Sequence, residues 1–68
     1  MNESAGPTPE EIAGARTAAG LTQAQAAALV WCSEITWRQW EKSPGVPGAR
    51  RMHPCFWWAF RQRIATNQ

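Results

Sequence analysis

Three helix-start signals follow one another along the first half of the chain, and they constrain its fold more than any other feature. The string from Thr8 to Glu11 places a capping hydroxyl, a proline and a glutamate in the order that begins a helix. Thr22 and Gln25 form a second capping box, and Ser33 is a third N-cap residue. Because each signal begins a new helix, the sequence predicts a succession of short helices.

The first two helices are predicted between these signals. The first begins at Pro9 and ends at Gly20, since glycine readily adopts the left-handed conformation that ends a helix. Its apolar positions recur at helical spacing and comprise Ile12, Ala15, Ala19 and the stem of Arg16. The second begins after Thr22 and continues to about Val30, and its alanines allow a neighbouring helix to approach closely. Leu21 is expected to fill the space between the two helices.

A third helix is predicted over 34–42, after a turn formed by Trp31 and Cys32. Trp37 and Trp40 lie three residues apart in it, so they share one face. That face is expected to point toward the first two helices. We therefore assign both tryptophans to the core.

The last helix is predicted over 55–64. Two prolines and two glycines make 43–48 a loop, and His53 and Pro54 then restart the helical pattern near a cap. The positions expected to face the core are Phe56, Phe60, Arg63 and Ile64. The sequence thus predicts an all-α fold of four helices over 8–65, after a flexible tail at 1–7.

The length of 68 residues leaves room for one domain, whose buried surface is marginal at this size. Five tryptophans and two phenylalanines supply large apolar side chains, and burial against a second copy is another way to add stability. No apolar run approaches the length of a membrane span, and the N-terminus lacks the pattern of a signal peptide. We therefore expect a cytoplasmic protein with no membrane contact.

The residues that often carry chemistry are few. Cys32 and Cys55 leave two states open, a single disulfide or reduced thiols packed as small hydrophobes, and a cytosolic chain favours the second. With His53 they do not have the spacing of a zinc site, so no metal is expected. One histidine, no tyrosine, no paired carboxylates in a predicted pocket and no glycine-rich phosphate loop argue against an enzyme and against a cofactor.

Charge is unevenly distributed, although the formal net charge is only +2. Residues 1–41 carry two arginines and five glutamates, whereas 42–68 carry one lysine, four arginines and no acid. A basic segment of this kind suits a phosphate backbone, although a solvated loop and helix end would have the same composition.

The string from Leu21 to Glu41 resembles the helix-turn-helix of the Cro/C1-type (XRE) family of bacterial and phage repressors. The positions that match the family pattern are Leu21, Thr22, Gln23, Ala27, Ser33, Thr36, Trp37, Trp40 and Glu41. The first helix and the segment after Arg51 also resemble short phage members, so the resemblance covers about residues 8–64. It implies a lambda-repressor-like helix-turn-helix domain and a dimeric regulator of transcription, a repressor from a phage or mobile element acting in the bacterial cytoplasm.

Two features depart from that family. Trp31 stands where the family usually has glycine. A left-handed tryptophan is strained, so either the turn differs in detail or Trp31 packs on a neighbour. The usual fifth helix is absent, which leaves the mode of dimerisation open.

The resemblance implies binding to double-stranded DNA at a palindromic operator, and Ser33 caps a helix whose N-terminus can enter a major groove. The residues assigned to base reading are Glu34, Ile35, Thr36, Arg38 and Gln39. The residues assigned to phosphate contacts are Thr22, Gln23, Ser33, Lys42, Arg50 and Arg51. Two alternatives to these DNA contacts stay open. Glu34 and Arg38 have the i,i+4 spacing at which they would form an ion pair with each other, and Gln23 would do no more than cap its helix.

Adjacent tryptophans in the last helix predict a homodimer. Trp57 and Trp58 point about 100° apart, and Phe56 and Phe60 already occupy the core face. One indole is therefore expected to point outward and, with Arg61, to anchor a second copy through the C-terminal helix. The alternative is that the small core wraps both indoles.

A second class of function fits the same fold, namely binding to another protein. A phage inhibitor of host defence, such as an anti-CRISPR protein, or an antitoxin would have a host protein as partner. The extra aromatic residues, Trp31 at the turn and the modest net charge favour this alternative.

Overall fold

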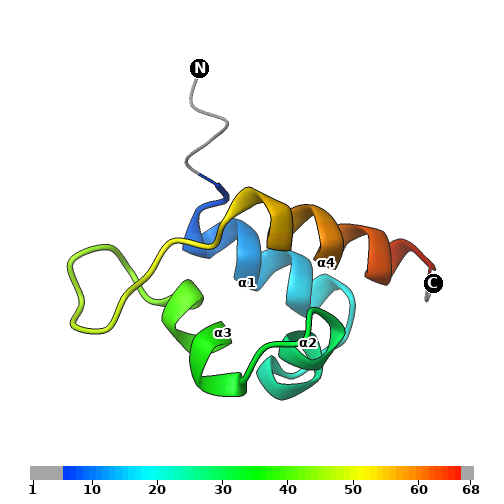
Figure 1. Ribbon diagram of the computed structural model, residues 1–68, viewed down its shortest axis with the longest axis horizontal. Coiled ribbons are helices and arrows are strands. Elements are labelled where there is room, and N and C mark those ends of the chain that lie inside the picture. Colours follow the sequence, from blue (N-terminus) through cyan, green and yellow to red (C-terminus); the bar gives the residue numbers. More distant parts are fainter. Residues whose placement is uncertain (1–5, 67–68) are drawn as a thin grey trace.

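Residues 6–66, which the computed structural model describes, form four α-helices and no strand. They are α1 (Pro9–Ala18), α2 (Gln23–Leu29), α3 (Glu34–Glu41) and α4 (Pro54–Thr66). In Figure 1, α1 and α4 form an upper layer and run in the same direction, while α2 and α3 lie beneath them. The prediction of a small all-α domain with four helices is confirmed.

The capping signals act as predicted. The Thr8 hydroxyl accepts a hydrogen bond from the Glu11 amide at 3.1 Å, and the Thr8 amide donates to the Glu11 carboxylate at 2.9 Å. Thr22 and Gln25 repeat the same reciprocal pair at the same two distances. The Ser33 hydroxyl accepts from the Thr36 amide at 3.1 Å. These contacts satisfy amides that a helix start leaves without a partner, which is why the helices begin where the sequence places them.

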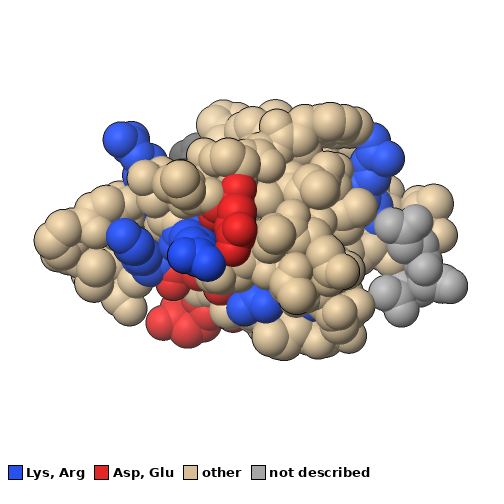
Figure 2. All heavy atoms as spheres, turned by 90° about the horizontal axis from the view of Figure 1, so that it is seen from below, with Lys and Arg blue, Asp and Glu red and all other residues tan. Residues whose placement is uncertain are grey.

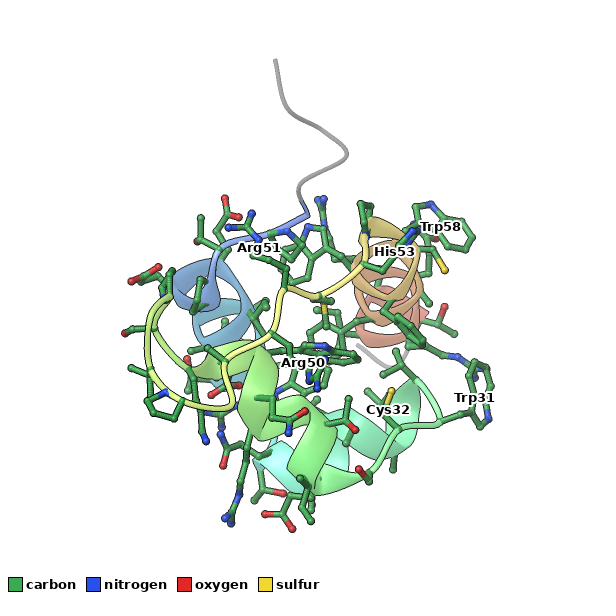
Figure 3. All side chains as sticks on the ribbon, turned by 60° about the vertical axis from the view of Figure 1, so that its left-hand side comes forward. Trp31, Cys32, Arg50, Arg51, His53 and Trp58 are labelled. Atoms are coloured by element: carbon green, nitrogen blue, oxygen red, sulfur yellow. The ribbon has the colours of Figure 1, made fainter. Side chains whose placement is uncertain are left out.

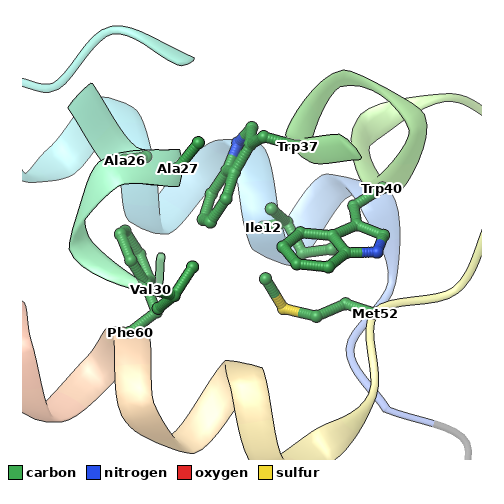
Figure 4. Packing of buried hydrophobic residues seen from close by; sticks show 8 residues of the cluster. All are labelled: Ile12, Ala26, Ala27, Val30, Trp37, Trp40, Met52 and Phe60. Carbon is green, nitrogen blue, oxygen red and sulfur yellow. The ribbon is translucent and has the colours of Figure 1, made fainter. Parts of the chain in front are cut away.

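The core lies between the two layers and is built around three large aromatic side chains (Figure 4). Its buried members are Ile12, Ala26, Ala27, Val30, Trp37, Trp40, Met52 and Phe60. The ring of Trp37 lies 4.9 Å from that of Phe60 and 5.5 Å from that of Trp40, measured between centroids. Trp40 also contacts Phe56 at 5.3 Å. The assignment of both α3 tryptophans to the core is confirmed, and α4 reaches them through Phe56 and Phe60.

Two predictions about α4 were wrong, and one buried residue before it was not predicted. Arg63 is exposed instead of facing the core, because it lies at the edge of the apolar stripe. Cys55 is exposed and so is not a packing residue. Its amide, near the helix start, donates to Nδ1 of His53 at 3.0 Å. Met52, a loop residue that no helical pattern marks, is fully buried.

Both cysteines are free, so the disulfide alternative is not realised. Cys32 is half-buried and packs against the core, as expected. Burial raises the pKa of its thiol, which leaves less of the reactive thiolate at neutral pH. Within the described part of the chain no cluster of His, Cys, Asp and Glu could hold a metal ion.

The start of the chain is only partly described, and residues 1–5 of the predicted tail lie outside the described residues. Pro7 is buried, and the Gly6 carbonyl accepts a hydrogen bond from the Arg51 guanidinium at 3.0 Å. Gly6 has a φ of +78°, and a Cβ there would overlap the Met52 carbonyl. These two residues therefore pack against the segment that leads into α4.

The turn between α2 and α3 keeps a left-handed residue despite carrying tryptophan. Trp31 has a φ of 59°, and the Cys32 amide donates to the Ala27 carbonyl at 3.0 Å to close the end of α2. The Trp31 side chain is 76% exposed, and the Arg63 guanidinium lies 4.4 Å above its ring. Of the two alternatives, Trp31 therefore packs on a neighbour, in a cation–π contact with α4.

Candidate nucleic-acid interface

The position of α3 is set by a hydrogen-bonded group around Glu41, the last residue of that helix. The Glu41 carboxylate accepts from the Arg16 guanidinium at 2.7 and 3.2 Å, from the Trp37 indole at 2.6 Å and from the Gln23 amide at 3.0 Å. Arg16 also donates to the Leu21 carbonyl at 3.0 Å. One carboxylate thus joins α1, α2 and α3, and we call these four side chains, Arg16, Gln23, Trp37 and Glu41, the Glu41 hub.

The hub is partly shielded from water, with the Arg16 and Glu41 side chains 17% and 10% exposed. Burial alone would raise the pKa of Glu41. The hydrogen bonds from Arg16, Trp37 and Gln23 and the positive charge of Arg16 outweigh it, so the net pKa is lowered. The carboxylate is therefore ionised at neutral pH, and directional charge-assisted bonds hold α3 in one orientation.

This hub was not predicted from the sequence. Only the stem of Arg16 was assigned, to an apolar stripe, and Gln23 was given a contact with phosphate or a role as a cap. In the structure the Gln23 side chain instead donates inside the protein. A possible signal was the spacing of Trp37 and Glu41 at i and i+4, which puts an indole donor next to a carboxylate on one helix face.

The outer face of α3 carries the residues predicted to read bases. Glu34, Ile35 and Arg38 are exposed, with 70% of Ile35 accessible, while Thr36 and Gln39 are half-buried. Glu34 and Arg38 form an ion pair at 2.8 Å, so the alternative based on their spacing is realised. The structure therefore brings three of the five residues to the surface together.

The other two are tied to the fold. The Thr36 hydroxyl accepts from the Ser33 hydroxyl at 3.0 Å. At Gln39 the tie is through the main chain: its main-chain carbonyl accepts from the Arg50 main-chain amide at 3.1 Å, which joins the loop after α3 to the end of that helix. Thr22 and Ser33 are exposed at the starts of α2 and α3, where both act as caps.

The three cations predicted to contact phosphate come together beside the end of α3. Lys42, Arg50 and Arg51 are all exposed, and they line one shallow cavity of about 210 Å³ next to Pro9. Lys42 donates to the Pro47 carbonyl at 3.2 Å. We call Lys42, Arg50 and Arg51 the basic cluster.

The charged side chains are not spread evenly over the underside of the molecule. Figure 2 shows basic and acidic side chains next to each other on the side that holds α3 and its loop, with other basic side chains near the C-terminal end. Most of the remaining face carries no charge. The α3 side is therefore a mixed surface with basic groups at its edge.

The predicted dimer residues lie on α4. Trp58 is 66% exposed, whereas Trp57 is half-buried and stacks on Phe60 at 6.3 Å between centroids. The exposed Arg61 guanidinium lies 5.8 Å above the Trp57 ring. In Figure 3, Trp58 and Trp31 project at one edge of the molecule, apart from Arg50 and Arg51. One indole points outward, as predicted, and the alternative in which the core wraps both indoles is not realised. The homodimer itself stays a prediction.

Comparison with known proteins adds no family. No protein-family model matches this chain, and no curated protein matches it.

No helix among residues 6–66 is long and apolar enough to cross a membrane.

Proposed function

We propose that this protein binds duplex DNA by placing α3 in the major groove, as a sequence-specific regulator that acts by occluding its site. The observation that carries the proposal is the division of α3 into two faces. Trp37 and Trp40 are buried on one, and Glu34, Ile35 and Arg38 are exposed on the other. A helix that is anchored by one face and free on the other can be inserted into a groove as a rigid body.

The exposed residues of α3 have suitable chemistry for reading base edges. Arg38 can donate two hydrogen bonds to guanine, Glu34 can accept from the cytosine amino group, and Ile35 can contact a thymine methyl. The ion pair between Glu34 and Arg38 does not prevent this. An exposed pair contributes about 0.2–1 kcal/mol, whereas a bidentate contact to the correct base discriminates by about 1–3 kcal/mol. Breaking the internal ion pair therefore costs no more than a correct base contact contributes to discrimination.

The basic cluster supplies the phosphate contacts that such a position requires. Lys42 follows α3 directly, and the loop after it brings Arg50 back to the helix, where the Arg50 amide is bonded to the last turn. Cations held at the end of a reading helix fix its register on the duplex without selecting sequence. Each phosphate that they neutralise contributes about −0.9 to the slope of log affinity against log salt.

The test begins with selection of bound fragments from a random duplex pool. On the selected site, Arg38→Ala is expected to weaken binding by about 5- to 150-fold, the loss of a bidentate base contact. Arg63→Ala is the matched control, since it removes the same charge from an exposed position on α4. Failure to select any preferred sequence, or equal losses in the two variants, would rule out base reading by α3.

A second candidate is binding to another protein, and the exposed indoles of Trp31 and Trp58 favour it. Tryptophan is enriched among the residues that dominate protein interfaces. In this case the partner is a host protein, and the chain acts as an inhibitor or an antitoxin. Selection then yields no operator, and activity survives Arg38→Ala but not Trp58→Ala.

A further inference from the structure

A groove lies between α1 and α4. It has a volume of about 360 Å³, and its lining is mostly apolar. The lining residues are Ala15, Ala18 and Ala19 from α1 and Arg61, Ile64 and Ala65 from α4. The small alanine side chains leave the groove open, so it can receive a large side chain from outside.

The groove lies next to an exposed indole. Trp58 and Ala65 are one heptad apart on α4, so they point only about 20° apart around the helix. Arg61 and Gln62 lie between them, and all four residues are exposed. They occupy one outward face that spans about 100°. The α4 helix therefore presents a large projecting residue at one end of this face and a small residue beside an apolar groove at the other.

This arrangement is self-complementary. In an antiparallel pair of α4 helices, a two-fold axis passing between Arg61 and Gln62 brings Trp58 of each copy opposite Ala65 of the other. The same axis pairs each Arg61 with Gln62 of the other copy, so a guanidinium meets an amide oxygen that accepts hydrogen bonds. A two-fold interface needs such reciprocal contacts, because both partners use the same surface.

We propose that the outward face of α4 and the adjoining groove form a homodimer interface, in which Trp58 of each copy enters the groove of the other. An indole buried in an apolar pocket with an arginine at the rim is the usual composition of an energetically dominant contact. Trp57 is not an anchor of this interface, since it already stacks on Phe60. The proposal does not rest on DNA binding.

Charge predicts an unusual salt dependence for this dimer. The described part of α4 carries Arg61 and Arg63 and no acid, so two copies of the helix repel each other. Salt screens that repulsion, and the dimer is expected to become tighter as salt is added. DNA binding is expected to weaken under the same change. Added salt is thus expected to have opposite effects on the dimer and on DNA binding, so an experiment can contradict one proposal without contradicting the other.

The experiment is sedimentation equilibrium of the full chain over a wide range of concentrations, at low and at high sodium chloride. The expected mass rises from the 7.6 kDa of one chain toward twice that value, more readily at high salt. Trp58→Ala is expected to raise the dimer dissociation constant by roughly 30-fold or more, as for a dominant interface residue. Its matched control is Trp31→Gly, which removes the other exposed indole and leaves the dimer unchanged.

A second pair of variants tests the groove itself. Ala18→Arg fills it from α1 without altering α4, and is expected to prevent dimerisation. Ala28→Arg makes the same change at an exposed position of α2 and is the control. Circular dichroism checks that each variant keeps its helix content. A wild-type mass that stays at one chain throughout, or a dimer that survives both Trp58→Ala and Ala18→Arg, would overturn the proposal.

Discussion

The two helices that pack on the central tryptophans, α1 and α4, are attached in different ways. α1 is joined to α3 through the Glu41 hub, where Arg16 and Glu41 make charge-assisted hydrogen bonds in fixed directions. The contacts of α4 with the two core tryptophans are aromatic, through Phe60 and Phe56. Apolar burial stabilises the fold but does not depend on orientation, whereas the hydrogen bonds of the hub require one orientation and contribute less free energy. The proposed reading helix is therefore oriented by the hub and stabilised by the aromatic core.

The largest expected effect is on the α4 side. Phe60→Ala removes a fully buried ring that contacts Trp37 and is expected to cost about 3–5 kcal/mol. A core of this size supplies only about 3–5 kcal/mol in total, so the variant should be largely unfolded at room temperature. Loss of the helical circular dichroism signal is the measurement. A cooperative unfolding transition near that of the wild type would show that α4 is not needed for the core.

The hub is expected to contribute less. Glu41→Ala leaves the Arg16 guanidinium and the Trp37 indole without their acceptor in a partly shielded site, which should cost about 2 kcal/mol. The measurement is the free energy of unfolding from urea titration. Glu34→Ala is the matched control, because it breaks an exposed ion pair of the same helix and should cost no more than about 1 kcal/mol. Equal losses would mean that the hub is no stronger than a surface pair.

The same two regions show how far the sequence could predict the structure. Capping signals act over three or four residues, so Thr8, Thr22 and Ser33 marked the helix starts correctly. The burial of Trp37 and Trp40 followed from helical spacing. In contrast, the hub joins residues up to 25 positions apart, and no local pattern shows that α1, α2 and α3 will meet at Glu41.

Errors on the α4 side have a related cause. Helical periodicity gives a broad apolar stripe, and it cannot tell whether a residue at the edge, such as Arg63, turns inward or outward. The position of Trp31 decided this, since its exposed ring offers Arg63 a partner outside the core. For the candidate site, the sequence identified the surface of α3 and the cations after it, but not that Gln23 is used inside the fold.

The hub also predicts a dependence of stability on pH. The pKa of Glu41 in the folded protein lies below its ordinary value of 4.5, so the folded state binds that proton less tightly than the unfolded chain does. The contribution of ionised Glu41 to stability is therefore complete above the ordinary pKa of 4.5, and it is lost as the pH falls through the lower pKa of the folded state. Unfolding free energies measured across this acidic range should fall more steeply for the wild type than for Glu41→Gln, which has no carboxyl group there to titrate. Parallel curves would contradict the role of the hub.

The smallest expected effect concerns the turn where α4 approaches Trp31. A left-handed backbone costs a non-glycine residue about 1–2 kcal/mol, and glycine avoids this cost. Glycine in turn loses about 0.5–1 kcal/mol on folding, because it has more conformational freedom in the unfolded chain. Trp31→Gly should therefore be more stable than Trp31→Ala by roughly 0.5–1 kcal/mol, since both variants lack the indole and differ only in backbone preference. The contact with Arg63, worth about 0.5–1 kcal/mol when exposed, is lost in both. If Trp31→Ala proves equal to Trp31→Gly in urea titration, the turn is not left-handed in solution. If the wild type exceeds Trp31→Gly, the cation–π contact outweighs the strain, and α4 is held by a polar contact as well as by its aromatic core.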